Sequence, residues 1–259
     1  STTEADAMIS VQKLKNHSFM GITLCLKNLF GLMPLQPDGR PRSYYHHLVR
    51  MPYMLADLGR IYDPVLNILD GLVCQAGQEW GPGDHPRIAN TLIAGDQVIA
   101  TDAVGAHLMG HDPQSDWLTE PFHRDRNALL IAALGGFGTV DLAEMDYASE
   151  VEAPVGEFFS RVTDPRETVL SWRRTTAEQG LYYRDHMHEI AREHAGRYIL
   201  LHMNKVVWSE TEGNLNVSRR DLAGLYKDQA LWMKYVDPDE AEGEHYEVYE
   251  DTLANFPAG

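Results

Sequence analysis

The sequence predicts an α/β fold, in which helices flank a mixed or parallel sheet and a small C-terminal α+β (β-β-α-β) unit follows. Two observations lead to this prediction. Short apolar runs typical of strands alternate with helical segments through the first half of the chain. Nearer the C-terminus, two β-like runs flank Met203-Asn204, a turn pair that is typical of a hairpin.

Composition and charge restrict the class of protein and of partner. The 259 residues suffice for one large domain, or for a medium domain with an appendage. Hydrophobic residues make up 44% and charged residues 23%, which excludes disordered, collagen-like and disulfide-rich classes. The formal net charge of −16 repels phosphate backbones and anionic lipids, so nucleic acid and membrane are not expected as partners.

The N-terminus and the two cysteines bear on the location of the protein and on the kinds of site that it can hold. The N-terminus is polar and acidic, and no apolar run reaches the length of a membrane span, so we expect a cytoplasmic location. Cys25 and Cys74 lie in apolar runs, which favours buried thiols, although one disulfide is chemically allowed. Two cysteines are too few for an iron–sulfur cluster or a four-thiolate zinc site.

The first half of the chain alternates between predicted strands and helices, and turn residues separate them. A helix that ends at Gly110, with Pro113 beyond it, has a good stop signal. One buried strand ends at the turn pair Asp70-Gly71. The predicted strands cover 9–12, 65–69 and 91–94, and the predicted helices cover 23–30, 44–62 (broken at Pro52) and 98–109.

The second half contains one long helix and the small β-rich unit. A short helix over 127–134 is closed by Gly135-Gly136, and few breakers interrupt 167–194. Strands over 197–202, 205–208 and 230–236 enclose a helix over 219–227 with Ser218 as N-cap. We therefore divide the chain into an α/β domain (1–145), a helical connector (146–195) and a small α+β unit with a tail (196–259).

Basic and imidazole side chains gather in Lys13-Leu-Lys15-Asn16-His17 and recur at Lys27-Asn28. Lysine binds carboxylate or phosphate, and histidine transfers protons or ligates a metal. By itself the first group is equally typical of a solvated basic turn. Lys27 lies in a long apolar run, where burial without a partner is costly, so it either extends to water or lines a pocket with Lys15 and His17.

Further candidates are a histidine pair and several acidic residues. His46 and His47 are adjacent, so on a helix they point in different directions, and we expect one at the site and one in a structural role. Asp102 falls in the first turn of a predicted helix, where the helix dipole favours a carboxylate, so a structural role is as well supported as a site role. The acidic and histidine candidates are Asp70, Glu79, Asp84, His85, Asp96 and Asp102.

Three other patterns resemble functional motifs but favour structural roles. His107 and His111 have the spacing of metal ligands, but Gly110 between them indicates a helix C-cap. The acidic and histidine residues of 185–194 spread around a long helix. Gly135-Gly136-Phe137-Gly138 lacks the G-x-G-x-x-G spacing of a dinucleotide site.

Several separated motifs, in order, resemble the family called domain of unknown function 362. The family core reads K-x-K-T-H followed by T-x-x-x-K-N-x-F-G, and this chain has Asn16 in place of the threonine. The resemblance covers about residues 9–113, and the family's N-terminal portion, expected before Ile9, is not found. The matching segments are 13–17, 23–31, 46–47, 56–58, 68–71, 81–82, 94–96 and 101–104. Residues 194–240 are similar to a small uncharacterised β-β-α-β domain.

The resemblance implies a fold more than a reaction, so three functional hypotheses stay open. The first is an enzyme for a small anionic metabolite, assisted by an unidentified metal or cofactor if one is needed. The second is a non-catalytic binding or assembly module, in which a partner chain or a second copy completes the sheet. The third is an accessory redox protein for an iron–sulfur partner.

For the enzyme hypothesis we assign each role to named residues. The catalytic candidates are Lys27, His17, His46 and Asp70. The substrate-binding candidates are Lys15, Asn28, Thr23 and Asp102. The metal-ligand candidates are His17, His46 and His47.

Overall fold

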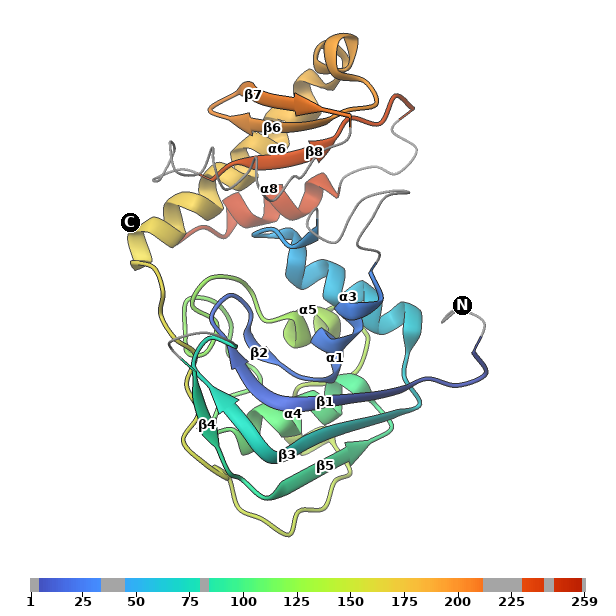
Figure 1. The fold of residues 1–259 in the computed structure, drawn as a ribbon, viewed down its shortest axis with the longest axis vertical. Helices are drawn as coiled ribbons and strands as arrows, with labels where there is room; N and C mark the ends of the chain where they lie inside the picture. Colours follow the sequence, from blue (N-terminus) through green and yellow to red (C-terminus); the bar gives the residue numbers. More distant parts are fainter. Residues whose placement is uncertain (1–4, 34–44, 80–83, 212–229, 240–244, 258–259) are drawn as a thin grey trace. The chain divides into compact units, whose positions relative to one another are not determined.

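The computed structural model describes residues 5–33, 45–79, 84–211, 230–239 and 245–257 (Figure 1). The chain divides into two compact units. The first consists of Ser1–Met33 and Met51–Thr163, and the second of Pro34–Arg50 and Asp164–Gly259. A mixed sheet with flanking helices in the first unit, and a small sheet in the second, confirm the predicted α/β class.

The sheet of the first unit is centred on two parallel strands, β1 (Ile9–His17) and β3 (Leu66–Ala76). The short strand β2 (Gly21–Thr23) pairs antiparallel with β1. Strands β4 (His85–Arg87) and β5 (Thr91–Gly95) both pair antiparallel with β3, each along a different half of it. The strand order is therefore β2-β1-β3-β4, with β5 also hydrogen-bonded to β3.

The predicted turn at Asp70-Gly71 is wrong, because strand β3 continues through this pair. Gly71 lies so close to β5 that a Cβ atom would be 2.6 Å from the Thr91 carbonyl oxygen, so glycine here permits strand pairing. The register with β1 shifts between Lys13 opposite Asp70 and Lys15 opposite Gln75. This bulge carries β3 onward to β4, which the local turn signal did not predict.

The first helices of this unit differ in extent from the prediction. In place of the helix over 23–30 there are an α-helical turn, α1 (Cys25–Asn28), and a 3-10 turn, η2 (Leu29–Leu32). Helix α3 (Arg50–Tyr62) runs through Pro52 without a break. Pro52 lies in its first turn, where proline removes no intrahelical hydrogen bond.

The remaining helices of the unit end where the sequence indicated. Helix α4 (Val98–Leu108) is followed by Gly110 at φ +85°, and the His111 N–H donates to the Ala106 carbonyl at 2.9 Å, which closes the helix. Helix α5 (Ala128–Leu134) begins at Asn127, whose side chain accepts from the Leu129 N–H. The 3-10 helix η3 (Leu142–Glu144) follows.

Helices α1 and α4 cover one face of the sheet (Figure 1). The contact is close, because a Cβ atom at Gly105 in α4 would lie 2.5 Å from Cδ1 of Leu69 in β3. Side chains on the other face are much more exposed, among them Ile9 and Val11 of β1 and Leu92 of β5. The core of the unit therefore lies on the helical side of the sheet.

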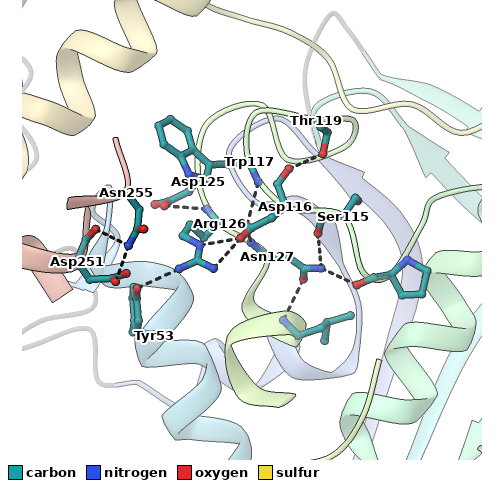
Figure 2. Close-up of polar contacts among 12 residues, drawn as sticks. Tyr53, Ser115, Asp116, Trp117, Thr119, Asp125, Arg126, Asn127, Asp251 and Asn255 are labelled. Atoms are coloured by element: carbon teal, nitrogen blue, oxygen red, sulfur yellow. Dashed lines mark hydrogen bonds and ion pairs between the residues drawn. The ribbon is translucent and has the colours of Figure 1, made fainter. Parts of the chain in front are cut away.

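A polar network orders the loop between α4 and α5 (Figure 2). One carboxylate oxygen of Asp116 accepts from Nε of Arg126 at 2.7 Å, and the other accepts from the Asn127 N–H at 2.8 Å. Arg126 also donates to the hydroxyl of Tyr53 in α3 at 3.4 Å. Asp116 thereby fixes the chain immediately before α5.

The second unit combines a long helix, α6 (Arg166–His194), with a three-stranded antiparallel sheet and helix α8 (Tyr246–Ala254). Its strands are β6 (Tyr198–His202), β7 (Lys205–Glu210) and β8 (Trp232–Tyr235), in the order β7-β6-β8. The predicted hairpin is confirmed, and Met203 and Asn204 have the positive φ angles of a tight turn. The predicted helix over 219–227, with its Ser218 cap, lies outside the described residues.

A buried aromatic cluster holds this unit together. Trp232 of β8 packs against the rings of Tyr183 and Tyr249, and its indole N–H donates to the Tyr249 hydroxyl at 3.2 Å. Gly180 of α6 lets the Tyr249 ring approach closely. None of the helices in the described part of the chain has the length and apolarity needed to cross a membrane.

Candidate functional site

Strand β1 separates its polar side chains between the two faces of the sheet. On the helical side, Ser10 accepts a hydrogen bond from Asn28, and Gln12 donates to the same residue. Because side chains alternate along a strand, Lys13, Lys15 and His17 share the opposite face. Lysine and imidazole groups therefore follow one another toward the carboxyl end of β1, where open α/β sheets usually bind ligands.

Glu79 joins two of these side chains through a single carboxylate. Its Oε1 lies 2.8 Å from Nζ of Lys15, and its Oε2 lies 2.7 Å from Nε2 of His17. All three side chains are mostly buried, with 20% of Lys15, 18% of Glu79 and 9% of His17 exposed. Lys15, His17 and Glu79 are called the carboxylate clamp below.

The His17 imidazole is held as one neutral tautomer. Its Nδ1 accepts hydrogen bonds from the backbone N–H groups of Phe19 at 3.0 Å and Met20 at 3.4 Å, so this nitrogen carries no proton. The proton therefore lies on Nε2, which donates it to Glu79. Desolvation by burial lowers the pKa of His17, and the charges of Lys27 and Lys15 lower it further, against the raising effect of Glu79.

Glu79 stays ionised although it is largely removed from water. Desolvation by burial alone would raise the pKa of its carboxyl group. That effect is outweighed by the hydrogen bonds from His17 and Lys15, by the charge of Lys15 and, at the low pH where Glu79 titrates, by the charge of protonated His17. Together they hold the pKa of Glu79 well below its ordinary value. At neutral pH the carboxylate clamp therefore contains one ammonium group, one carboxylate and one neutral imidazole.

The backbone on both sides of the clamp is anchored by Ser160. Its hydroxyl donates to the His17 carbonyl at 3.0 Å, and its backbone forms a parallel bridge with Gly77. Gly77 directly follows β3, so Ser160 connects the end of that strand to the His17 carbonyl, and Glu79 lies two residues further along. Glu79 itself has φ +92°, a left-handed conformation that is uncommon for residues other than glycine.

Two of the predicted site residues lie in α1, on the helical side of the sheet. Lys27 is placed with its Nζ 4.9 Å from the centroid of the Phe30 ring, and its charge acts on His17. Asn28 has a structural role, since its side chain bridges Ser10, Gln12 and the Val11 carbonyl of β1. Asn28 thus attaches the short helix to the strand.

Thr23 and Asp102 are both buried near this helix. Thr23 pairs with Lys15 in the strand register, so β2 places it beside the clamp strand. The Asp102 carboxylate accepts from the backbone N–H groups of Cys25 at 2.9 Å and Leu26 at 2.7 Å. The predicted first-turn position of Asp102 is wrong, because it is the fifth residue of α4 and stabilises the N-terminus of α1 instead.

The remaining candidates are Asp70, which has a different partner, and His46 and His47, which belong to the second compact unit. Asp70 is partly exposed and forms an ion pair with Lys13 at 2.6 Å. In the second unit, Nε2 of His47 lies 2.8 Å from the Leu231 carbonyl oxygen. Within the described ranges no three His, Cys, Asp or Glu side chains gather as metal ligands.

Glu79 is the clamp residue that the sequence did not single out. It was one of several acidic candidates in a stretch rich in glycine and proline, and no spacing rule connects it to Lys15 or His17. The fold brings it to β1 through the extension of β3 beyond Gly71.

The comparisons with known proteins agree with the predicted resemblance. Residues 1–107 match the family described as domain of unknown function (DUF362). This segment contains β1, α1 and most of α4, and therefore all three clamp residues and Asp102. The chain is also similar to a thylakoid-associated protein, sll1697, of Synechocystis sp. (strain ATCC 27184 / PCC 6803 / Kazusa).

That relative is 33% identical over 115 residues, which cover 42% of this chain and 34% of the relative. The chain thus spans about a third of the length of the curated relative that it matches. No solved structure matches the chain.

Proposed function

We propose that the first compact unit binds a small anionic metabolite through Lys15 and His17, as the first step of an enzymatic reaction. The observation that carries this proposal is the convergence of both side chains on one carboxylate, that of Glu79. Lysine and a neutral imidazole N–H are both donors to carboxylate and phosphate oxygens. Lys27 adds a further positive charge that acts on His17.

The local charge supports an anionic rather than a cationic ligand. The whole chain is strongly acidic, with a formal net charge of −16, so its field repels free anions. Among the described groups that act on the pKa of His17 the balance is reversed, because these are two lysines, Lys15 and Lys27, and one carboxylate, Glu79. A site for anions in such a protein requires this kind of local excess of cationic donors.

The catalytic part of the proposal depends on His17 changing partners. Both ring nitrogens are engaged, Nδ1 with backbone N–H groups and Nε2 with Glu79. Once Glu79 gives way to a bound molecule, the neutral Nε2–H of His17 can donate a hydrogen bond that polarises that molecule. The neutral form favoured by burial is the form that suits this exchange.

The test is titration with inorganic phosphate and with acetate, followed by calorimetry or by the NMR signals of His17. Lys15→Ala is expected to abolish binding and leave the fold intact, and Lys27→Ala is expected to weaken or abolish it. Lys13→Ala is the matched control, since Lys13 lies on the same strand face but pairs with the partly exposed Asp70 instead of Glu79. Unchanged binding in Lys15→Ala, or equal loss in Lys13→Ala, counts against the proposal.

A second candidate function is a binding or assembly module whose sheet is covered by a partner chain or a second copy. The observation that favours it is the exposed sheet face, where Ile9 and Val11 are each 56% exposed and Leu92 is 64% exposed. Light scattering on the isolated chain tests it. A stable monomer with no tendency to associate would count heavily against this function.

The cytoplasmic location and the redox role receive less support. The name of the cyanobacterial relative describes that protein as thylakoid-associated, so fractionation of native cells is the test of the proposed cytoplasmic location. The redox role finds no support among the described residues. Burial raises the pKa of both the Cys25 and the Cys74 thiols, which disfavours the reactive thiolate.

A further inference from the structure

We infer that Glu79 is an internal competitor, whose side chain occupies the binding site and is displaced by a carboxylate ligand. This inference rests on the proposed function and adds two statements to it. The preferred ligand group is a carboxylate, and the free site is closed by the chain itself. The geometry that leads to it is the pair of contacts from one carboxylate to Lys15 and His17.

The first step of the argument is the shape of the donor pair. The two oxygens of Glu79 each take a different donor, Nζ of Lys15 and Nε2 of His17, at 2.8 and 2.7 Å. These are the distances of charge-assisted hydrogen bonds. The donors are therefore already positioned for one planar carboxylate, and a ligand carboxylate that replaces Glu79 needs no rearrangement of β1.

The second step concerns the backbone that carries Glu79. The donors lie on a strand in the sheet, whereas Glu79 follows the end of β3 in a left-handed conformation at φ +92°. Such a conformation costs free energy for a residue with a Cβ atom and persists only where other contacts compensate for it. Here the contacts with Lys15 and His17 compensate, so release of the side chain also relieves backbone strain.

The third step concerns the anchors of this segment, which in the described part of the chain hold Gly77 and Gln78. Gly77 is fixed by its N–H donating to the Phe159 carbonyl at 2.9 Å and by its carbonyl accepting from the Arg161 N–H at 2.9 Å. Gln78 is held by its N–H donating to Asp84 at 3.2 Å. Glu79 can therefore turn away through its own dihedral angles while β3 and the Ser160 contact stay in place.

The exchange conserves charge, which makes it favourable in a buried site. An incoming carboxylate replaces one carboxylate beside Lys15, and the displaced Glu79 gains water as it leaves. Removing one member of a buried ion pair is costly because the other charge is left buried without a partner. In this exchange Lys15 has a carboxylate partner in both states, so that cost does not arise. A phosphate dianion carries more charge than the site releases, so acetate is the better probe.

The experiment compares acetate binding by wild type, Glu79→Gln and Glu79→Gly, followed by the His17 ring signals in NMR titrations. Glu79→Gln removes the competing charge at nearly constant size. Its affinity for acetate is expected to rise by about tenfold or more, since the lost contacts are hydrogen bonds to a charged group. Glycine relieves the positive φ and removes the side chain, so propionate, which matches the deleted atoms, is expected to bind and to raise the melting temperature.

Adding Lys15→Ala to Glu79→Gln serves as the specificity control, and the gain in affinity is expected to disappear. If wild type binds acetate and Glu79→Gln binds it equally or more weakly, Glu79 is not a competitor, and this inference falls while the proposed function stands. If no variant binds acetate, propionate or phosphate, the proposed function itself falls, and the inference with it. Should Glu79→Gln not fold, Glu79→Gly with and without propionate decides between the same outcomes.

Discussion

The carboxylate of Asp102 in helix α4 accepts a hydrogen bond of 2.9 Å from the backbone N–H of Cys25, 77 residues earlier in the chain. The adjacent Leu26 N–H donates to the other oxygen of the same carboxylate at 2.7 Å. A side chain of one helix thus supplies the N-terminal cap of another. Because α1 also carries Lys27, this contact connects the packing of the unit to the charge near the clamp.

Asp102→Asn is expected to lower the free energy of unfolding by about 1–3 kcal/mol. The substitution places an amide NH2 group, which cannot accept, against one of the two buried N–H donors, whereas both oxygens of the carboxyl group can accept in either protonation state. The measurement is urea unfolding at fixed pH. Asp112→Asn is the control, since Asp112 accepts from the Gln114 N–H in a similar way but is exposed. Equal effects of the two substitutions would show that burial of the Asp102 contact contributes nothing.

The same carboxylate is expected to make stability depend on pH. Desolvation by burial raises the pKa of Asp102 to about 7, although its two backbone donors oppose the rise, whereas the ordinary value is 3.8. Between these values the folded state binds more protons than the unfolded state, so the contribution of Asp102 to stability falls as the pH rises from about 4 to about 7.

The contribution of Asp102 is separated from those of other titrating groups by comparing wild type with Asp102→Asn at each pH. His17 has a lowered pKa, so its contribution has the opposite sign and is lost as the pH falls below 6.5. The difference in unfolding free energy between wild type and Asp102→Asn cancels the effect of His17. That difference is expected to shrink from pH 4 to pH 7, and a difference that is constant over this range would contradict the raised pKa.

The sequence predicted those parts of the fold that depend on neighbouring residues. Asn127 and Gly135 mark the two ends of α5, and Met203-Asn204 marks a hairpin, because caps and tight turns involve residues only a few positions apart. The contacts of Asp102 with Cys25 and of Glu79 with His17 join residues that are far apart in the chain. No local pattern specifies such pairs.

The candidate site was partly predictable for the same reason. Lys15 and His17 were recognisable because they lie two positions apart in one polar run. Their acceptor was not, because it depends on β3 continuing beyond Gly71. The turn signal of Asp70-Gly71 was outweighed by the pairing of β3 with β5. That pairing depends on the close approach of Thr91 to Gly71, which exists only in the folded chain.

Asn127→Ala is expected to destabilise the protein by about 2–4 kcal/mol, because it removes a helix cap together with further buried hydrogen bonds. The Asn127 side chain accepts from the Leu129 N–H and donates to the carbonyl groups of Pro113 and Ser115, at 2.8 and 3.0 Å. Asp141→Ala is the matched control. Asp141 caps η3 through the Ala143 N–H at 3.0 Å but is partly exposed, so a loss of about 0.5–1 kcal/mol is expected there.

Chemical denaturation of both variants checks this prediction, with amide hydrogen exchange in α5 as a second readout. Faster exchange confined to α5 in Asn127→Ala would show that only the cap matters. Faster exchange that extends into the loop around Asp116 would show that the two donated hydrogen bonds hold the network of Figure 2 in place. A destabilisation no larger than that of Asp141→Ala would contradict the prediction.

Gly71→Ala tests whether glycine is what allows β3 to continue past the predicted turn. A Cβ atom there would lie 2.6 Å from the Thr91 carbonyl oxygen, so β5 has to move away and the Gly71–Thr91 pairing is lost. We expect a loss of about 1–3 kcal/mol in stability, as for other overpacked positions. Gly31→Ala is the control, because no described atom lies within 4 Å of a Cβ at that position. Alanine is therefore expected to be neutral or slightly stabilising at position 31.

Because β3 also leads to Glu79, Gly71→Ala is further expected to shift the His17 ring signals, which Gly31→Ala leaves in place. If the ring signals do not respond to Gly71→Ala, the extension of β3 and the position of Glu79 are independent of each other.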